Sequence, residues 1–193
     1  MKGSGIYDFV YRGRLTEAAL ERTQARRRIG FTREEEQLIG QKLSLDVIDS
    51  DLVESARKMA IVYTAIASLE NSIRSFVSKI LLDKFAENWW EEAVTEGIRK
   101  RADSRQDEEK SIRWHSQRGN NPLYFTEFGD LVSIMQSNWS LFEPHLISVE
   151  WARNIIKTLE RSRNVIMHSG ELSNTDIERI GTAIRDWIAQ VGI

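Results

Sequence analysis

The scarcity of proline limits the folds open to this sequence more than any other feature. The chain of 193 residues contains two prolines, Pro122 and Pro144, so long segments run without a residue that would break a helix. Apolar residues recur at spacings of three and four, as on one face of an α-helix, whereas alternating strand patterns beside turn dipeptides are hard to find. We therefore predict an all-α fold, a helical bundle with an N-terminal helical extension.

The longest predicted helix begins near Asp49–Asp51 and continues to about Lys84. Its apolar positions follow steps of three, four and seven and so share one face: Leu52, Met59, Val62, Ile66, Leu69, Ile73, Phe76, Val77 and Ile80. We expect this helix to pack with the segments 126–138, 148–169 and 174–191. The domain boundary is placed accordingly, with an extension over 1–48 and the bundle over 49–193.

Capping signals predict the remaining helices. In the first half of the chain the signals are Thr16 for 16–28, Thr32 with Glu35 for 32–43, and Asn88 with Glu91 for the helix that opens NWWEEAVTEGIRK. In the second half, Thr126 would begin a helix to Asn138, and a short helix would cover 139–143 before Pro144. Ser148 would cap a helix to Ser169 with Gly170 at C′, and SNTD (173–176) would begin the last helix. Residues 99–121 are charged on all sides, which predicts a solvated helix or mobile segment.

Composition excludes several classes of protein. There is no cysteine, so disulfides, thiolate catalysis and cysteine metal sites are excluded. The longest uncharged helical run, MAIVYTAIASL (59–69), is too short to span a bilayer, and the first residues lack an apolar leader, so we expect a cytoplasmic protein without a membrane partner. The net charge is −2, so any nucleic acid must bind to a local basic patch.

Residues 161–170, RSRNVIMHSG, contain the strongest candidate for a catalytic site. The three histidines are far apart in sequence and no HExxH motif or glycine-rich phosphate loop occurs, so we predict no cofactor and no metal. Arg163, Asn164 and His168 lie at the end of a predicted helix, where cations also simply complement the helix dipole. Five residues correspond to about 500° of helical rotation, so the side chains of Arg163 and His168 diverge by about 140°. A full site would need a wall from elsewhere, such as a second copy of the helix.

The pattern Arg-Asn-x3-His in an all-α bundle of this size resembles the HEPN superfamily of nucleotide-binding domains and ribonucleases. LENSIRSFV (69–77) and YFTEFGDLVSIMQSNWSLF (124–142) resemble the HEPN branch named after a nuclear mRNA-surveillance endoribonuclease. The resemblance covers about 50–191. It implies that residues 49–193 form a HEPN-like helical bundle.

The resemblance also implies an activity and partners. HEPN ribonucleases are metal-independent and form homodimers in which two motifs meet, so RNA is the expected substrate. His168 would act as general base or acid, because imidazole exchanges protons near neutral pH. Arg163 would bind the scissile phosphate, and Asn164 would orient the histidine or the phosphate. An antitoxin or other defence-system protein is an expected partner, in toxin–antitoxin or phage defence.

Supporting residues are expected on the facing helix. Glu70, Asn71 and Arg74 are spaced for one face, and Glu70 would fix Arg163 or His168; alternatively, Glu70 forms only an intrahelical pair with Arg74. A different class of function stays open as well. The domain would then be a non-catalytic nucleotide- or RNA-binding or dimerisation module.

Three further features could contact RNA, and two of them have a second interpretation. Arg26-Arg27-Arg28 could guide RNA phosphates or lie at a solvated helix end. Trp89 and Trp90 could stack on bases or pack in the core. Trp114 and His115, in the charged segment, would form a base-contact site.

Overall fold

The computed structural model describes residues 32–192, and these residues form helices and connecting turns without a β-strand. The predicted all-α class is therefore confirmed. The chain divides into two units, Met1–Val53 and Glu54–Ile193, which are considered separately. The helix predicted over 16–28 and the Arg26-Arg27-Arg28 cluster lie outside the described residues.

In the first unit, helix α2 (Arg33–Lys42) has the predicted capping box. The Thr32 hydroxyl accepts from the Glu35 amide at 3.0 Å, and the Glu35 carboxylate accepts from the Thr32 amide at 2.8 Å. A short 3₁₀ helix, η1 (Leu45–Val47), follows. No residue of α2 is buried.

Helix α3 (Ser50–Phe85) has 36 residues and provides the longest wall of the second unit. No proline or glycine interrupts it. Its buried apolar residues repeat at spacings of three and four and are Met59, Val62, Ile66, Leu69, Ile73, Val77 and Leu81. Leu52, which was predicted to share this face, is exposed.

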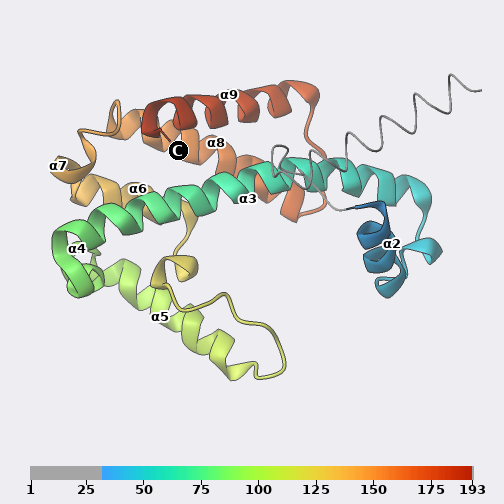
Figure 1. The fold of residues 1–193 in the computed structure, drawn as a ribbon, viewed down its shortest axis with the longest axis horizontal. Coiled ribbons are helices and arrows are strands. Elements are labelled where there is room, and N and C mark those ends of the chain that lie inside the picture. The colour runs from blue at the N-terminus through green and yellow to red at the C-terminus, as the bar shows by residue number, and fades with distance from the viewer. Residues whose placement is uncertain (1–31, 193) are drawn as a thin grey trace, which may run out of the picture. The chain divides into compact units, whose positions relative to one another are not determined.

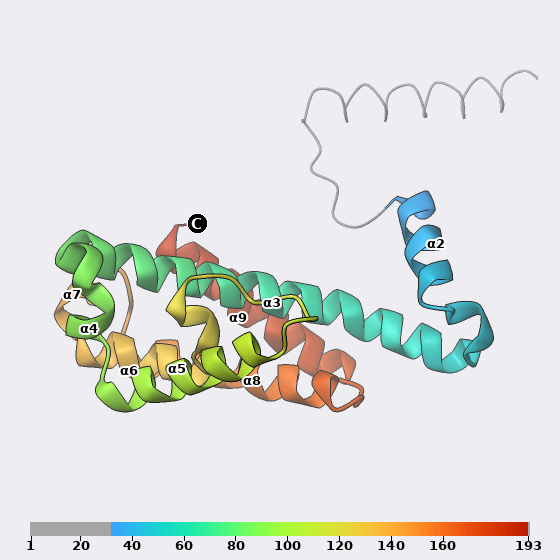
Figure 2. The same cartoon turned by 90° about the horizontal axis from the view of Figure 1, so that it is seen from below.

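Helices α6 (Phe128–Ser137), α8 (Val149–Met167) and α9 (Asn174–Val191) complete the bundle, with the four-residue α7 (Trp139–Phe142) between α6 and α8. Figures 1 and 2 show α8 and α9 alongside α3, and one core cluster joins all three helices, as predicted. Trp187 of α9 is fully buried; its ring stacks on that of Trp151 at 5.5 Å and meets the edge of Phe76 at 6.0 Å. The predicted caps at Ser148 and Ser173 are both formed.

The capping box predicted at Asn88 is wrong. Asn88 is the last residue of the 3₁₀ helix η2 (Ala86–Asn88) and has φ −88° and ψ 5°, whereas an N-cap residue needs extended backbone. Its side chain makes no capping hydrogen bond. The predicted helix is also interrupted: α4 (Trp89–Ala93) ends where Val94 becomes extended, and α5 (Glu96–Ser111) starts anew after Thr95. Trp89 and Val94 are buried, so tertiary packing overrides the local signal, and Trp89 packs in the core.

Helix α5 shows that the charged segment is not solvated on all sides. Ile98 and Ala102 are buried against the bundle, and the chain then continues through exposed residues 111–120. The 3₁₀ helix η3 (Pro122–Phe125) follows. Helix α6 begins two residues later than predicted, at Phe128, because Thr126 is buried and its hydroxyl contacts Arg74 instead of capping the helix.

Candidate functional site

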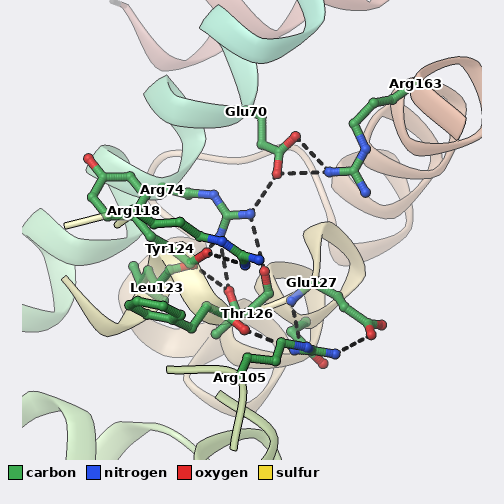
Figure 3. Close-up of polar contacts among 11 residues, drawn as sticks. Glu70, Arg74, Arg105, Arg118, Leu123, Tyr124, Thr126, Glu127 and Arg163 are labelled. Carbon is green, nitrogen blue, oxygen red and sulfur yellow. Dashed lines mark hydrogen bonds and ion pairs between the residues drawn. The ribbon is translucent and has the colours of Figure 1, made fainter. Parts of the chain in front are cut away.

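Glu70 lies where α3 faces α8 and holds two arginines. Its carboxylate accepts from Nη2 of Arg74 at 2.6 Å, and its two oxygens accept from Nη1 of Arg163 at 3.2 and 3.0 Å. Figure 3 shows Glu70 between the two guanidinium groups. Glu70 is 9% exposed, so both ion pairs form largely away from water. Both contacts foreseen for Glu70 are present together: the intrahelical pair with Arg74 and the pair with Arg163.

Arg74 fixes the segment that leads into α6. Its Nη1 donates to the carbonyl of Leu123 and to the hydroxyl of Thr126 at 2.9 Å, and its Nη2 also donates to the Thr126 carbonyl at 3.2 Å. Arg74 is 7% exposed, and both terminal nitrogens of its guanidinium are hydrogen-bonded within the protein, as Figure 3 shows. It is therefore a structural cation, and Arg163 is the member of the cluster that still reaches solvent, with 28% of its side chain exposed.

The end of α8 has a defined backbone path. Ser169 adopts a left-handed conformation with φ 60°. The amide of Gly170 donates to the Val165 carbonyl at 2.8 Å, and the amide of Ser169 donates to the Ile166 carbonyl at 3.0 Å. This pair of bonds is a Schellman motif, in which Ser169 is C′ and Gly170 is C″. The prediction of Gly170 at C′, with the helix continuing to Ser169, is thus wrong by one to two residues.

Gly170 is required by a close approach. A Cβ at this position would lie 2.8 Å from Cγ1 of Val165 and 3.0 Å from its carbonyl oxygen. The glycine therefore lets the chain fold back directly after His168, which is the C-cap residue of α8.

Asn164 and His168 are exposed and four residues apart, so they share a face of α8 beside the face of Arg163 and Met167. Within residues 32–192, no side-chain hydrogen bond or ion pair involves Asn164 or His168, and neither residue lines the pocket that contains Arg163. Arg163 and His168 of one chain are thus turned to different surroundings, as the helical geometry predicts.

A pocket of about 810 Å³ lies between α3, α5, η3 and α8. Asn71 and Tyr63 of α3 line it together with Arg163 and Met167 of α8. Of the predicted site residues, it collects Glu70, Asn71, Arg74 and Arg163, and it leaves out Asn164 and His168.

Two arginines of this pocket, Arg105 and Arg118, were missed by sequence reasoning. Arg105 donates from Nη1 to the Phe125 carbonyl at 2.9 Å and pairs with Glu127, and the guanidinium of Arg118 lies 5.6 Å from the Phe125 ring. Arg105 follows Ala102 and Ile98 at steps of three and four, so its place on the buried face of α5 could have been inferred. Arg118 lies in an irregular segment and gives no such signal.

The remaining predictions concern Trp114, His115, metal ligands and membrane spans. Trp114 is exposed and, like His115, does not line the pocket. In the part of the chain that the structure describes, no group of three histidine, aspartate or glutamate side chains could hold a metal ion. No helix of the described residues is long and apolar enough to cross a membrane.

The all-α bundle is the fold of a HEPN domain. The chain belongs to the Swt1-like HEPN family, whose sequence model matches residues 64–192. This match includes Glu70 and the whole segment from Arg163 to His168. The comparisons with curated proteins and with solved structures gave no significant match.

Proposed function

We propose that this protein is a metal-independent endoribonuclease of the HEPN type, with a composite site formed by two copies of the chain. The observation that carries the proposal is the arrangement at the end of α8. Arg163 is held by Glu70 and still reaches solvent. Asn164, the next residue, and His168, just over one turn further along, are exposed, and their side chains have no hydrogen bond or ion pair with residues 32–192.

Arg163 would bind the scissile phosphate. Its hydrogen bonds to Glu70 use Nη1, and among the described residues no contact occupies Nη2 or Nε. A guanidinium has five N–H donors, so this cation can contact phosphate oxygens while Glu70 keeps it in place. Glu70 would therefore be a positioning residue.

His168 would act as the general base or the general acid of the cleavage reaction. A base removes the proton of the 2′-hydroxyl, whose oxygen attacks the adjacent phosphorus; the 5′-oxygen of the next nucleotide leaves and takes up a proton. The products are a 2′,3′-cyclic phosphate and a 5′-hydroxyl, so no water or metal-bound hydroxide is consumed in this step. Asn164 would orient the imidazole or the phosphate.

The second motif would come from a second copy. Arg163 and His168 diverge on one helix, so a second α8 is the simplest source of the missing wall. Val165 and Met167 are exposed apolar side chains within the motif itself, and apolar groups of this kind favour a protein interface. Sedimentation analysis should show a dimer at tens of micromolar, and a monomer would contradict the composite site.

A non-catalytic RNA- or nucleotide-binding module is the second candidate. One observation favours this candidate. The buried carboxylate of Glu70 already pairs with Arg163 and offsets part of the positive charge of this arginine. The two candidates differ in outcome, because a binding module retains RNA without cutting it.

The test is cleavage of mixed RNA in the presence of EDTA. Arg163→Ala should lower the rate about 10²- to 10³-fold, and His168→Ala about 10²- to 10⁴-fold. Arg153→Ala, on the same helix, is the matched control for the arginine, and His145→Ala, outside the pocket, is the control for the histidine; both should cleave like wild type. Cleavage that is undiminished in both motif variants would end the proposal.

A further inference from the structure

The pocket beside Arg163 extends well past the Arg-Asn-x3-His motif. Its far wall comes from Arg105 of α5 and from Arg118 and Tyr124 of the segment before α6, while α3 contributes Tyr63. In Figure 3, Arg118 and Tyr124 lie on the opposite side of Glu70 from Arg163. Tyr124 begins the stretch 124–142 that carries part of the family resemblance, whereas Tyr63, Arg105 and Arg118 lie outside every motif of the sequence. The catalytic proposal assigns a role to none of the four residues.

The pocket carries a surplus of positive charge. Four arginines and two glutamates line it, and Glu109, which lies outside the lining, pairs with Arg118, so the local net charge is one positive. Both glutamates are already paired, Glu70 with Arg74 and Arg163, and Glu127 with Arg105. The lining therefore offers cations, and no unpaired carboxylate, to a ligand.

Arg118 is the cation best placed to bind an anion. Its side chain is 54% exposed, and its contacts are long: Nη1 lies 3.5 Å from the Tyr124 carbonyl, and Nε lies 3.7 Å from the Glu109 carboxylate. These contacts use few of its five N–H donors. Arg105, in contrast, is engaged with Phe125 and Glu127 and serves to hold the wall together.

Two phenol rings lie among these cations. Tyr63 and Tyr124 are 38% and 39% exposed, although each is large and partly apolar. Aromatic rings beside cations are the combination that binds single-stranded nucleic acid, because every base has a face that can stack and every nucleotide has a phosphate. A base in a duplex is already stacked on its neighbours, so this chemistry selects an unpaired strand.

The pocket also has a suitable size and position. A volume of about 810 Å³ lies in the range of small-ligand pockets, about 300–1,000 Å³. Its lining includes Arg163 and Met167, so it opens at the end of α8, next to His168 in the sequence.

We propose that this pocket binds a nucleotide of a single-stranded RNA next to the phosphate held by Arg163. Arg118 contacts a phosphate of the strand, and the rings of Tyr63 and Tyr124 provide the stacking surface for the base. The placement beside the scissile phosphate rests on the proposed function, whereas the binding of a single strand rests on the pocket alone.

The experiment measures RNA binding separately from cleavage. Fluorescence anisotropy of a labelled single-stranded RNA of about 12 nucleotides is recorded with the full chain carrying His168→Ala, which prevents cleavage, from about 50 to about 300 mM salt. In this background, Arg118→Gln should weaken binding and reduce the slope of log Kd against log salt by about 0.7, the value for one phosphate contact. Tyr63→Leu or Tyr124→Leu should raise Kd about 5- to 150-fold. Arg185→Gln, an exposed arginine of α9 outside the pocket, is the matched control and should change neither quantity.

The possible results distinguish the pocket proposal from the nuclease proposal. Pocket variants that bind RNA like the control would overturn the pocket assignment, and the nuclease proposal would stand if wild-type protein still cleaves RNA. Weakened binding in the pocket variants, together with intact RNA after incubation with wild type, would support the pocket and overturn the nuclease proposal. AMP bound as tightly as the RNA would show that the ligand is a mononucleotide. This result would overturn the proposal that the pocket binds a single strand of RNA.

Discussion

Glu70→Gln isolates the contribution of the charge that joins α3 to α8. The substitution keeps the size of the side chain and replaces the carboxylate by a neutral amide, which leaves the guanidinium groups of Arg74 and Arg163 facing an uncharged group. Removing one partner of a buried ion pair costs about 3–5 kcal/mol. Arg74 keeps three other acceptors, and Arg163 is 28% exposed and can turn to water, so we expect about 2–4 kcal/mol.

This loss is large against the usual stability of a domain, about 5–15 kcal/mol. With a urea dependence of about 2 kcal/mol/M, the unfolding midpoint should fall by about 1–2 M. The assay is urea unfolding followed by circular dichroism at the helix band. Loss of helix signal at a lower urea concentration, without a change in slope, is the expected result.

The matched control is Glu96→Gln on α5. Glu96 also pairs with a cation four residues on, with Nζ of Lys100 at 2.7 Å, but both side chains are exposed, at 69% and 74%. An exposed pair of this kind contributes at most about 0.5 kcal/mol. If Glu70→Gln shifts the midpoint no more than Glu96→Gln, the cluster does not hold Arg163 and the reasoning from burial is refuted. A double variant with Arg163→Gln should cost less than the sum of the two single changes, because the two residues contact each other.

Three more predictions follow from single contacts. Gly170→Ala should cost about 1–3 kcal/mol, because its Cβ would lie 2.8 Å from Cγ1 of Val165; an unchanged melting temperature would contradict this. Thr126→Val, which removes the hydroxyl that accepts from an arginine, should cost about 1–3 kcal/mol, while Thr182→Val on the exposed side of α9 should cost far less in the same urea titration. The pKa of Asp176 lies below the 3.8 of an ordinary aspartate, first because the capping serine donates a hydrogen bond to it. Its contribution to stability should therefore be present above pH 3.8 and be lost as the pH falls through the lower folded value, so wild type and Asp176→Asn should converge in acid; a constant difference would contradict this.

The sequence predicted those parts of the fold that local physics controls. The face of α3 follows from its unbroken periodicity, and the caps at Thr32, Ser148 and Ser173 follow from hydrogen bonds between residues three apart. Asn88 has the same local pattern, but the neighbouring side chains of Trp89 and Val94 are buried, and the backbone they impose leaves no extended cap. Local signals fail where packing sets the dihedral angles.

The candidate site was foreseen in a different way. Glu70 and Arg163 are 93 residues apart, and no spacing or periodicity brings them together; the family resemblance did. Family membership is confirmed, whereas the homodimer, the roles of Arg163, Asn164 and His168, the N-terminal extension over 1–48 and a part in toxin–antitoxin or phage defence stay predictions. Arg118 was missed because it lies in a segment without regular structure, where only the three-dimensional path of the chain shows its neighbours.

The most direct test of the central claim is the chemistry of the RNA ends. A short RNA and the same RNA with a single 2′-deoxy nucleotide at the cleaved position are incubated with wild type, Arg163→Ala and His168→Ala in EDTA. We expect wild type to leave a 2′,3′-cyclic phosphate on the all-ribose RNA and to spare the 2′-deoxy position, and both variants to lose about 100-fold or more in rate. Cleavage at the 2′-deoxy position, or cleavage by both variants at the wild-type rate, would contradict the assignment of this helix end to a ribonuclease site.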